Sequence, residues 1–472
     1  MIGALSWSSI NIGSIQIIQL VIGIILARIL MPEDFGLIGV LYIFIGISTV
    51  LIDGGFGQGL IRKQDADQKD FSTIFLFNIF ISICLYLLLY FTAPFIATFF
   101  SQPELTSLSR VLFLSVLLYP FYQIQLVQLL KQLDYKSIAI INIISVSVSG
   151  VLAATLALKG LGVWSLVYQQ LAFHLIKAIT FPFFLKWKPT LIFSVFTIQS
   201  LWRFSVPMLG QSVLNVIFNQ IYLIIIGKFY PITQVGYFAQ ANKYSETVNV
   251  ASQNIISSAT FPLLAKIQND KERTLRVYRK LITAVSTVTF PLVIFIFIAA
   301  EPIIITLITE KWMNSAILLQ LLLIANIFNP MFTININILN AQGSSKKTLK
   351  LEIFKKSLIL ISILGCFRYG IEIMLAGFVV ANILAYLISM VYIKQSLQHY
   401  YRHQILDLSS KLLIAVFTGS IVALLGKLNL HHLHQLILQI IAFALVYFVL
   451  IRIFFPLQIK EIFQLFATKS KS

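Results

Sequence analysis

Residues 10–60 read INIGSIQIIQLVIGIILARILMPEDFGLIGVLYIFIGISTVLIDGGFGQGL, and this stretch decides the fold. It holds two long apolar runs, and the short turn Met31-Pro32-Glu33-Asp34 separates them. About 20 consecutive apolar residues form a helix that is long enough to cross the hydrocarbon core of a bilayer. The stretch therefore predicts two helices that cross a membrane one after the other.

The rest of the chain has the same character. Of its 472 residues, 58% are hydrophobic and only 11% are charged, and the mean hydropathy is +0.90. A soluble globular chain carries about 25% charged residues. Because long apolar runs recur from end to end, we expect an all-α polytopic membrane protein without a soluble domain.

The net charge of +18 does not indicate nucleic acid as a partner, because the Lys and Arg residues lie in short loops between apolar runs. The first thirty residues have no basic start and no small-residue cleavage site, so we expect the first span to be retained. Both cysteines, Cys84 and Cys366, fall inside apolar runs, where we expect them to be packing residues.

Apolar windows predict about fourteen transmembrane helices. The first six are expected at residues 10–30, 36–60, 72–100, 108–130, 138–158 and 161–185. The next six are expected at residues 201–227, 235–265, 281–306, 317–339, 354–368 and 373–393. The last two are expected at residues 412–425 and 436–455.

Lys and Arg are distributed unequally between the two sets of loops. One set, together with the C-terminal tail, holds 27 of the 35 Lys and Arg residues, the other set holds 7, and Lys243 lies inside a span. Cytoplasmic loops carry the excess of Lys and Arg in membrane proteins. We therefore expect a multi-pass membrane protein with both termini in the cytoplasm.

The chain repeats itself weakly at an offset of about 200 to 210 residues, which is typical of transporters. The repeat predicts two pseudo-symmetric six-helix lobes, at residues 1–190 and 191–398. An additional two-helix pair and a cytoplasmic tail are expected at residues 399–472. The matching segments are Trp7 with Trp202, residues 31–36 with 230–236, Tyr119-Pro120 with Asn329-Pro330, and Lys159-Gly160 with Tyr369-Gly370.

The sequence offers little for an enzyme. A membrane glycosyltransferase or polymerase needs catalytic groups in a long extracytoplasmic loop, whereas all outward loops here are short. Glu33 and Asp34 in the first outward loop suit a solvated helix cap at least as well as a catalytic pair. There is no Walker A sequence, so we do not expect this chain to hydrolyse ATP.

One histidine cluster remains, with His431, His432 and His434 between the last two spans. A metal site and a solvated polar turn both fit this cluster, and we favour the turn. We expect no catalytic residue, no metal and no cofactor.

Polar residues recur every three or four positions in four of the predicted spans. Polar groups inside a membrane tend to face a bundle interior or a water-filled cavity. Interhelical hydrogen bonds, each worth about 0.6 to 2 kcal/mol, are the alternative role. We favour a hydrophilic cavity between the lobes, with Asn215, Asn219, Asn329 and Asn337 as candidate substrate-binding residues. The stripes are Ser9, Gln16, Gln19 and Gly23; Gln125, Gln128 and Gln132; Ser212, Asn215, Asn219 and Tyr222; and Asn326, Asn329, Thr333, Asn337 and Asn340.

Four charged residues in the predicted spans or at their edges are candidates for function: Arg28, Asp53, Lys243 and Glu246. Lys243 and Glu246 are three positions apart, so they either neutralise each other or serve the cavity. Asp53 precedes the glycine-rich residues 54–59, so it either caps a helix break or binds a coupling ion.

Two motifs carry a resemblance to a known family. Leu26-Ala27-Arg28-Ile29-Leu30-Met31-Pro32-Glu33-Asp34-Phe35-Gly36-Leu37 and Asp53-Gly54-Gly55-Phe56-Gly57-Gln58 resemble the polysaccharide transporter family, which contains lipopolysaccharide and capsule flippases. This family belongs to the multidrug/oligosaccharidyl-lipid/polysaccharide exporter superfamily. Gly227-Lys228-Phe229, Gly236-Tyr237-Phe238 and Asn242-Lys243 resemble the start of its second lobe. Many relatives carry an arginine where this chain has Gln240, so no role is carried over to that position.

The resemblance implies a flippase of the bacterial inner membrane that alternates its access. It would move an undecaprenyl-pyrophosphate-linked oligosaccharide, the repeat unit of a surface polysaccharide, from the cytoplasmic to the periplasmic leaflet. Arg28 and Lys243 are then candidate substrate-binding residues on a path for the pyrophosphate, and a snorkelling side chain is the alternative for Arg28. Asp53 and Glu246 are the candidate ion-coupling residues.

The implied partners are the lipid-linked oligosaccharide and membrane lipids, with a polysaccharide polymerase and glycosyltransferases as further candidates. An ion-coupled drug or metabolite antiporter of the same superfamily is the main alternative function. A membrane glycosyltransferase or polymerase is a weaker alternative.

Overall fold

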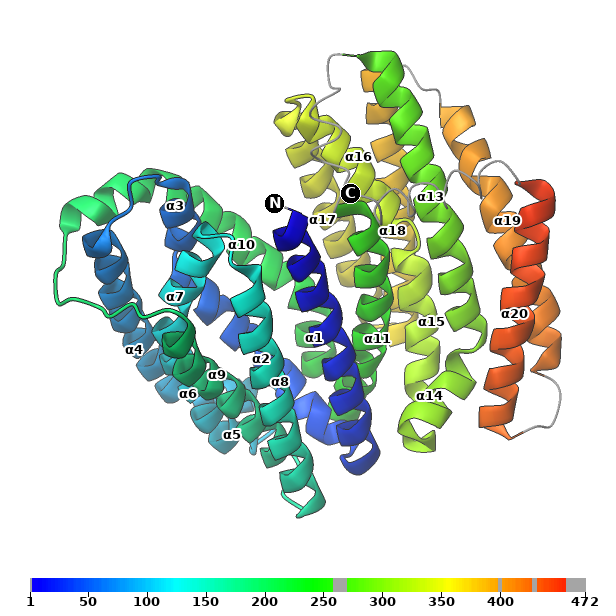
Figure 1. Cartoon of the computed structure of the whole chain (residues 1–472). Coiled ribbons are helices and arrows are strands. Elements are labelled where there is room, and N and C mark those ends of the chain that lie inside the picture. The colour runs from blue at the N-terminus through cyan, green and yellow to red at the C-terminus, as the bar shows by residue number, and fades with distance from the viewer. Residues whose placement is uncertain (1, 258–269, 398–400, 427–430, 456–472) are drawn as a thin grey trace. The chain divides into compact units, whose positions relative to one another are not determined.

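The computed structural model describes residues 2–257, 270–397, 401–426 and 431–455. The regular elements in these ranges are all helices (Figure 1). Contacts divide the chain into two compact units, Met1–Ala239 (unit 1) and Gln240–Ser472 (unit 2). Five of the lysines counted for the topology lie outside the described residues: Lys266, Lys427, Lys460, Lys469 and Lys471.

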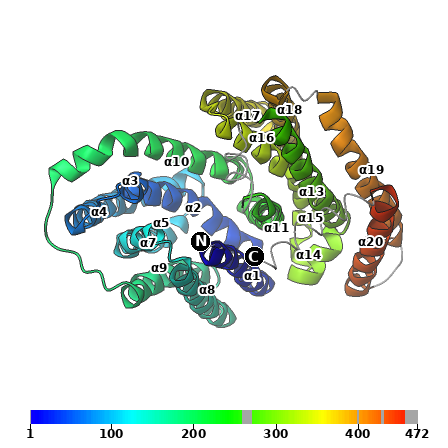
Figure 2. The same ribbon diagram turned by 45° about the horizontal axis from the view of Figure 1, so that its top comes forward.

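In unit 1, α8 packs against both α1 and α9, and α10 runs along α2 and α3 (Figure 2). α4 packs against α2, α5 and α7. The helices of this unit are α1 (Ile2–Ile29), α2 (Pro32–Asp53), α3 (Phe56–Arg62), α4 (Gln68–Phe99), α5 (Leu105–Leu112), α6 (Leu114–Leu118), α7 (Pro120–Lys131), α8 (Tyr135–Leu158), α9 (Trp164–Phe184), α10 (Val195–Phe229) and the first residues of α11 (Ile232–Ser257).

In unit 2, α18 packs against α15, α16 and α17, and the last two helices pack on α13 and α14. Besides the rest of α11, the elements of this unit are α13 (Lys271–Ile298), α14 (Ala300–Ile308), the 3₁₀ helix η1 (Glu310–Trp312), α15 (Asn314–Asn326), α16 (Asn329–Ala341), α17 (Ser345–Cys366), α18 (Ile371–Leu397), α19 (Tyr401–Leu425) and α20 (His432–Phe454).

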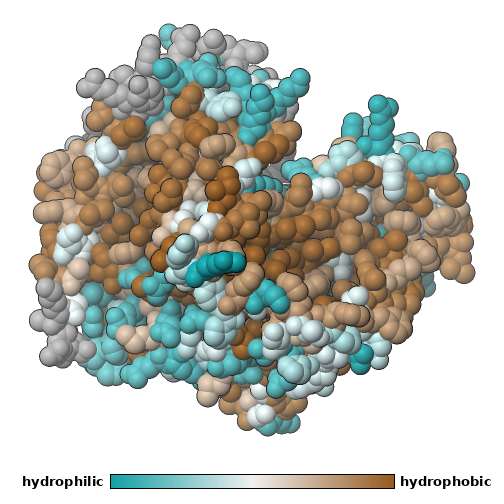
Figure 3. Space-filling view, turned by 180° about the vertical axis from the view of Figure 1, so that it is seen from behind, coloured by the Kyte–Doolittle hydropathy of each residue, from teal (hydrophilic) through white to brown (hydrophobic). Residues whose placement is uncertain are grey.

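Ten of the described helical stretches are long and apolar enough to cross a membrane, and the number is eleven if the bent pair Leu105–Leu118 and Pro120–Lys131 counts as one span. Much of the face shown in Figure 3 is accordingly hydrophobic, although hydrophilic residues also reach this face. The protein is thus an all-helical, multi-pass membrane protein. The expected number of fourteen spans stays a prediction.

The other three predicted spans coincide with α9, α11 and α17, which are helical but less apolar. Each of them carries a lysine within the helix, namely Lys177, Lys243 and Lys355. A charged or strongly polar residue lowers the mean hydropathy of a span, and it is tolerated where the surrounding helices provide partners. These three helices are therefore where polar function is to be sought.

In α9 the polar residues have partners inside unit 1. The Tyr122 hydroxyl lies 2.8 Å from Nδ1 of His174, and the Gln170 amide nitrogen lies 3.0 Å from Nε2 of the same ring. The Lys177 ammonium lies 4.4 Å from the centre of the Phe173 ring. Because His174 is buried with both ring nitrogens occupied, this cluster ties α7 to α9.

The glycine-rich residues after Asp53 break the second span. α2 ends at Asp53, and α3 begins at Phe56. Gly54 and Gly55 between them have φ angles of 57° and 76°, in the left-handed region that favours glycine. A Cβ at Gly55 would lie 2.4 Å from the backbone oxygen of Ser205 in α10, so this glycine also permits close packing.

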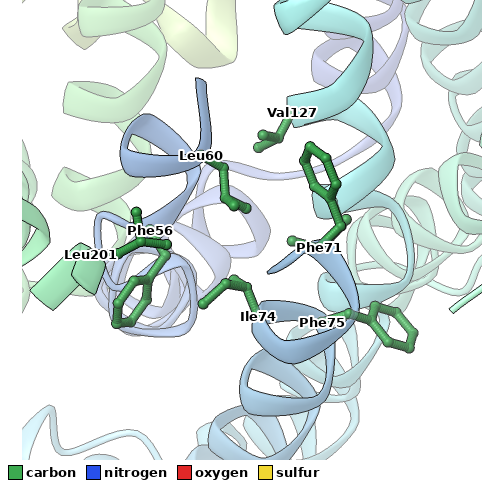
Figure 4. Packing of buried hydrophobic residues seen from close by; sticks show 8 residues of the cluster. Phe56, Leu60, Phe71, Ile74, Phe75, Val127 and Leu201 are labelled. Atoms are coloured by element: carbon green, nitrogen blue, oxygen red, sulfur yellow. The ribbon is translucent and has the colours of Figure 1, made fainter. Parts of the chain in front are cut away.

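Apolar residues hold the short helix α3 in place after this break (Figure 4). Phe56 and Leu60 of α3 are 2% and 0% exposed and pack against α4, α7 and α10. The direction in which the chain leaves Asp53 is thus fixed by a packed core. The buried cluster consists of Phe56, Leu60, Phe71, Ile74, Phe75, Ile124, Val127 and Leu201.

The segment between α9 and α10 is bonded to the start of α4. The Gln68 amide donates a 2.6 Å hydrogen bond to the backbone oxygen of Lys188, and the Trp187 indole donates one of 2.6 Å to the Gln68 oxygen. The backbone N–H of Thr190 donates to the Ser72 hydroxyl at 3.0 Å. These bonds fix the entry into α10.

Asp70 lies next to this segment and is 4% exposed. Its carboxylate accepts hydrogen bonds from the Lys63 ammonium at 2.6 Å and from the Thr197 hydroxyl at 2.8 Å. The bond to Asp70 raises the pKa of the Lys63 ammonium above its usual range. Lys63, Asp70 and Thr197 therefore join the end of α3 to the starts of α4 and α10.

The starts of α2 and α11 meet through two reciprocal glycine contacts. A Cβ at Gly36 would lie 2.2 Å from the backbone oxygen of Ile232, and one at Gly236 would lie 1.9 Å from that of Pro32. At an offset of 200 residues, Gly36 corresponds to Gly236 and Pro32 to Ile232. The glycine of each helix therefore contacts the backbone carbonyl group at the equivalent position of the other helix. This reciprocity is expected for a pseudo-symmetric pair.

Candidate functional site

A polar pocket lies at the break of the second span. It has a volume of about 150 Å³, and its lining comes from three separate segments of unit 1. The lining residues are Thr49, Val50, Asp53, Gly55, Tyr119, Gln123 and Ser212.

Asp53 provides the one carboxylate of this pocket. The Gln123 amide donates a 2.7 Å hydrogen bond to Oδ1 of Asp53, and the backbone N–H groups of Gly55 and Gly57 also donate to the carboxylate. A Cβ at Gly57 would lie only 2.6 Å from Oδ1, so glycine is needed there for the carboxylate to reach the backbone. Asp53 therefore caps the break and also faces a pocket, so the two roles expected for it are compatible.

Gln123 was not among the residues expected in the site. The predicted stripe of the fourth span begins two positions later, with Gln125 and Gln128, and both of these side chains are buried. The Oε1 atom of Gln125 and the Nε2 atom of Gln128 have no hydrogen-bond partner among the described residues. A three-or-four spacing fixes which residues share a face, but it does not fix which face meets Asp53.

In α10 the predicted stripe is partly brought to the pocket. Ser212 lines it, and Asn215 and Asn219 are exposed at positions one and two turns further along the helix. In α1, Gln16 is half-buried, Gln19 is exposed and Gly23 is buried, and the side chain of Ser9 lies outside the described residues. Asn215 and Asn219, two candidate substrate residues of unit 1, thus lie on α10 beyond the pocket residue Ser212.

In unit 2 the asparagines of the tenth span divide into two groups. Asn335 is 0% exposed, accepts a hydrogen bond from the Tyr278 hydroxyl at 3.1 Å and donates one to Ser389 at 2.7 Å. It joins α13, α16 and α18 and was missed by the sequence pattern. Asn329 and Asn337 are half-buried, and the Asn329 oxygen accepts a 3.1 Å hydrogen bond from the Lys355 ammonium.

The other charged candidates differ in exposure. Arg28 is exposed, one residue before the end of α1. In α11, Lys243 is half-buried and Glu246 is exposed, and no ion pair joins them. Mutual neutralisation therefore does not account for these two residues.

The polar turns of the loops that were predicted to face outward have local structural roles. The Met31 backbone N–H donates to Oδ2 of Asp34 at 2.9 Å, which is the helix cap expected for the start of α2. Glu33 accepts a 3.1 Å hydrogen bond from the Thr233 hydroxyl. Within the described ranges, no group of three or more His, Cys, Asp or Glu residues could hold a metal ion, and this includes His431, His432 and His434.

The fold is that of the multidrug/oligosaccharidyl-lipid/polysaccharide exporters. The inward closed conformation of the lipid II flippase MurJ matches with a TM-score of 0.78, at 17% identity, over 95% of this chain and 98% of that one. An inward-facing multidrug resistance MATE transporter of the same superfamily matches with a TM-score of 0.61, at 15% identity, over 83% of this chain and 99% of that one.

Sequence comparison identifies the family. The family described as "Polysaccharide biosynthesis protein" matches residues 25–317. The chain belongs to this family, and it has the fold of the exporter superfamily. The resemblance seen in the opening motifs is thereby confirmed.

Three curated relatives are similar over much of the chain. The succinoglycan biosynthesis transport protein ExoT of Rhizobium meliloti (strain 1021) is 27% identical over 61% of this chain, which spans 58% of ExoT. The teichuronic acid biosynthesis protein TuaB of Bacillus subtilis (strain 168) is 26% identical over 71% of this chain and 70% of TuaB. The lipopolysaccharide biosynthesis protein WzxC of Escherichia coli (strain K12) is 24% identical over 86% of this chain and 84% of WzxC.

Proposed function

We propose that this chain is a flippase for an undecaprenyl-pyrophosphate-linked oligosaccharide, the repeat unit of a surface polysaccharide, and that it works by alternating access across the bacterial inner membrane. The observation that carries the proposal is the family match over residues 25–317. The likeness in fold to a lipid II flippase supports a lipid-linked substrate.

The finer architecture is part of the proposal. We infer fourteen spans, in two pseudo-symmetric six-helix lobes at residues 1–190 and 191–398 and a helical pair and tail at residues 399–472. Eleven of these spans correspond to stretches that are long and apolar enough to cross a membrane, the bent pair counted as one. The other three are supported because α9, α11 and α17 are helical. The reciprocal glycine contacts between α2 and α11 support the pseudo-symmetry.

The proposed roles of the site residues follow from charge and position. Arg28 and Lys243 offset the charge of the pyrophosphate, because a multiply negative group needs cationic partners in a low-dielectric path. Asp53 is the proposed coupling carboxylate, because it faces a pocket, and Glu246 is the second acid to test. The proposed polar lining consists of Asn215, Asn219, Asn329 and Asn337.

Deletion of the gene tests the function. We expect loss of the surface polysaccharide and accumulation of the lipid-linked oligosaccharide in the inner leaflet, both restored by the wild-type gene. The double variant Arg28→Gln/Lys243→Gln should be present at near-normal abundance yet fail to restore them. Glycan composition and the accessibility of the lipid-linked oligosaccharide to an impermeant reagent provide the measurements.

Normal polysaccharide in the deletion strain would refute the flippase. If that strain became sensitive to cationic drugs instead, the second candidate, an ion-coupled antiporter, would be favoured. The likeness in fold to a multidrug transporter and the acidic pocket at Asp53 keep this candidate in consideration.

The proposed orientation places both termini in the cytoplasm, and reporter fusions test it. A reporter that is active only outside the cytoplasm should be inactive after Lys471 and active when inserted between Leu430 and Leu436. The physical reason is the excess of Lys and Arg on one set of loops. The reverse pattern of activity would overturn the orientation.

A further inference from the structure

Lys355 was counted as a loop lysine, but it lies well inside a helix. α17 begins at Ser345, so Lys355 is ten residues into the helix, about 15 Å from its start at 1.5 Å per residue. Lys346 and Lys350, nearer the start, are exposed, whereas Lys355 is half-buried. Its ammonium lies 4.7 Å from the centre of the Phe332 ring, and Phe332 is 5% exposed.

No carboxylate forms an ion pair with Lys355 in the described part of the chain. Glu352, one turn before Lys355, acts on the ammonium through its charge but does not bond to it. A lysine within a membrane helix is costly and pairs with other groups where it occurs. The ring and one amide oxygen compensate the charge only in part.

The groups around Lys355 offer hydrogen-bond donors. The ammonium carries three donors, and the one hydrogen bond it makes goes to Oδ1 of Asn329 at 3.1 Å. The amide nitrogen of Asn329 makes no hydrogen bond to the described residues and carries two donors of its own. A place with a cation and unused donors suits an anion with several acceptor oxygens.

The position of this pair in the fold points to transport. Asn329 and Pro330 start α16 directly after the break that ends α15 at Asn326. The sequence repeat aligns Asn329 with Tyr119, which lies at the corresponding break between α6 and α7 and lines the pocket of Asp53. Interrupted helices carry the substrate and ion sites of many transporters. The break before α7 in unit 1 thus adjoins a pocket that holds an acid, whereas the equivalent break before α16 in unit 2 adjoins a cation.

We propose that Lys355 and Asn329 form an anion-binding subsite for the phosphate or carboxylate groups of the saccharide substrate. This proposal rests on the proposed function, since it assigns part of the same substrate to unit 2. The ammonium binds the anion, and the Asn329 amide turns its free N–H groups toward it. Phe332 shields the pair from one side.

Binding of inorganic pyrophosphate to the purified full chain in lipid nanodiscs tests the subsite by titration calorimetry. Lys355→Met should weaken binding about tenfold or more, as expected for the loss of a charged hydrogen bond. Lys355→Arg should retain most of the affinity. Lys228→Met is the matched control, because the Lys228 ammonium also has one carbonyl acceptor, at 2.7 Å, and a phenylalanine ring at 4.5 Å, but at an exposed helix end.

Unchanged affinity in Lys355→Met would overturn the proposal, as would equal losses in Lys355→Met and Lys228→Met. Glucuronate, titrated in the same way, distinguishes the sources of the anion: tighter binding of pyrophosphate indicates the lipid carrier, and tighter binding of glucuronate indicates an acidic sugar. If wild-type protein binds neither probe, the subsite does not exist. Asn329→Leu, which keeps the lysine, should weaken binding by a smaller factor.

Failure of the flippase function has a different signature. Normal polysaccharide in the deletion strain, together with pyrophosphate binding that depends on Lys355, would refute the flippase and leave the anion subsite standing. Loss of polysaccharide in the deletion strain, together with pyrophosphate binding that does not depend on Lys355, would support the flippase and refute the anion subsite. Thermal unfolding of each variant shows whether a loss of binding comes from misfolding.

Discussion

Asp53→Asn is expected to abolish the dependence of transport on an ion gradient while the protein remains folded. Asparagine keeps the oxygen that accepts from Gln123 but cannot gain or lose a charge. Moving one elementary charge across 100 mV supplies about 2.3 kcal/mol, which is roughly a fifty-fold shift in the transport equilibrium. In vesicles with an imposed proton or sodium gradient, the variant should lose this stimulation and keep its unstimulated rate.

Three further variants separate coupling from helix capping. Asp53→Glu should recover part of the stimulation, because it restores the acid. Asp134→Asn is the structural control, since Asp134 caps the start of α8 through the N–H of Ser137 at 3.1 Å and lines no pocket described here. Glu246→Gln tests the second acid, which is exposed. Stimulation that survives in Asp53→Asn but is lost in Glu246→Gln would assign coupling to Glu246.

The region around Asp53 shows how far the sequence could lead. The glycine run predicted a break after Asp53, and the two left-handed glycines form it. Local chemistry was sufficient there, because a backbone preference belongs to the residue itself. The partner Gln123 could not be predicted, because its contact with Asp53 depends on how α7 is rotated against α2, and only packing fixes that rotation.

Lys355 shows a different limit. Lysines count toward the cytoplasmic loops under the positive-inside rule, and Lys355 comes shortly after Lys346, Lys347 and Lys350. The predicted span accordingly begins only at residue 354, whereas α17 begins at Ser345. The lysine itself indicated that a partner was needed, because a helix that continues through a lysine needs a group that bonds to its ammonium. The sequence could not identify that partner, because Asn329 lies 26 positions away.

The asparagines of the tenth span show why polar stripes alone do not define a cavity. Asn335 bonds to Tyr278 and Ser389 in the packed interior of unit 2, whereas Asn329 bonds to a lysine. Both uses satisfy polar groups that lipid would leave unpaired. Spacing cannot distinguish them, because each kind of partner sits on another helix.

The reciprocal glycines Gly36 and Gly236 are expected to be the glycines least tolerant of a side chain. In Gly36→Ala or Gly236→Ala the new Cβ would meet a backbone oxygen at 2.2 or 1.9 Å, and a backbone atom cannot turn aside as a side chain can. Overpacking typically costs about 1 to 3 kcal/mol and occasionally more. We expect each variant to lower the thermal unfolding temperature of the purified protein and its abundance in the membrane, with Gly236→Ala the more severe.

Two other glycines provide a graded control. At Gly227 a Cβ would meet the Val40 side chain at 2.5 Å, which can shift, so Gly227→Ala should cost less. At Gly210, inside α10, a Cβ would meet nothing within 4 Å, so Gly210→Ala should stabilise the helix by about 0.5 to 1 kcal/mol. If Gly36→Ala and Gly236→Ala unfold at the same temperature as Gly210→Ala, the starts of α2 and α11 do not make this contact in the protein. Because the contact joins the two sequence repeats, its absence would also remove the structural support for their pseudo-symmetry.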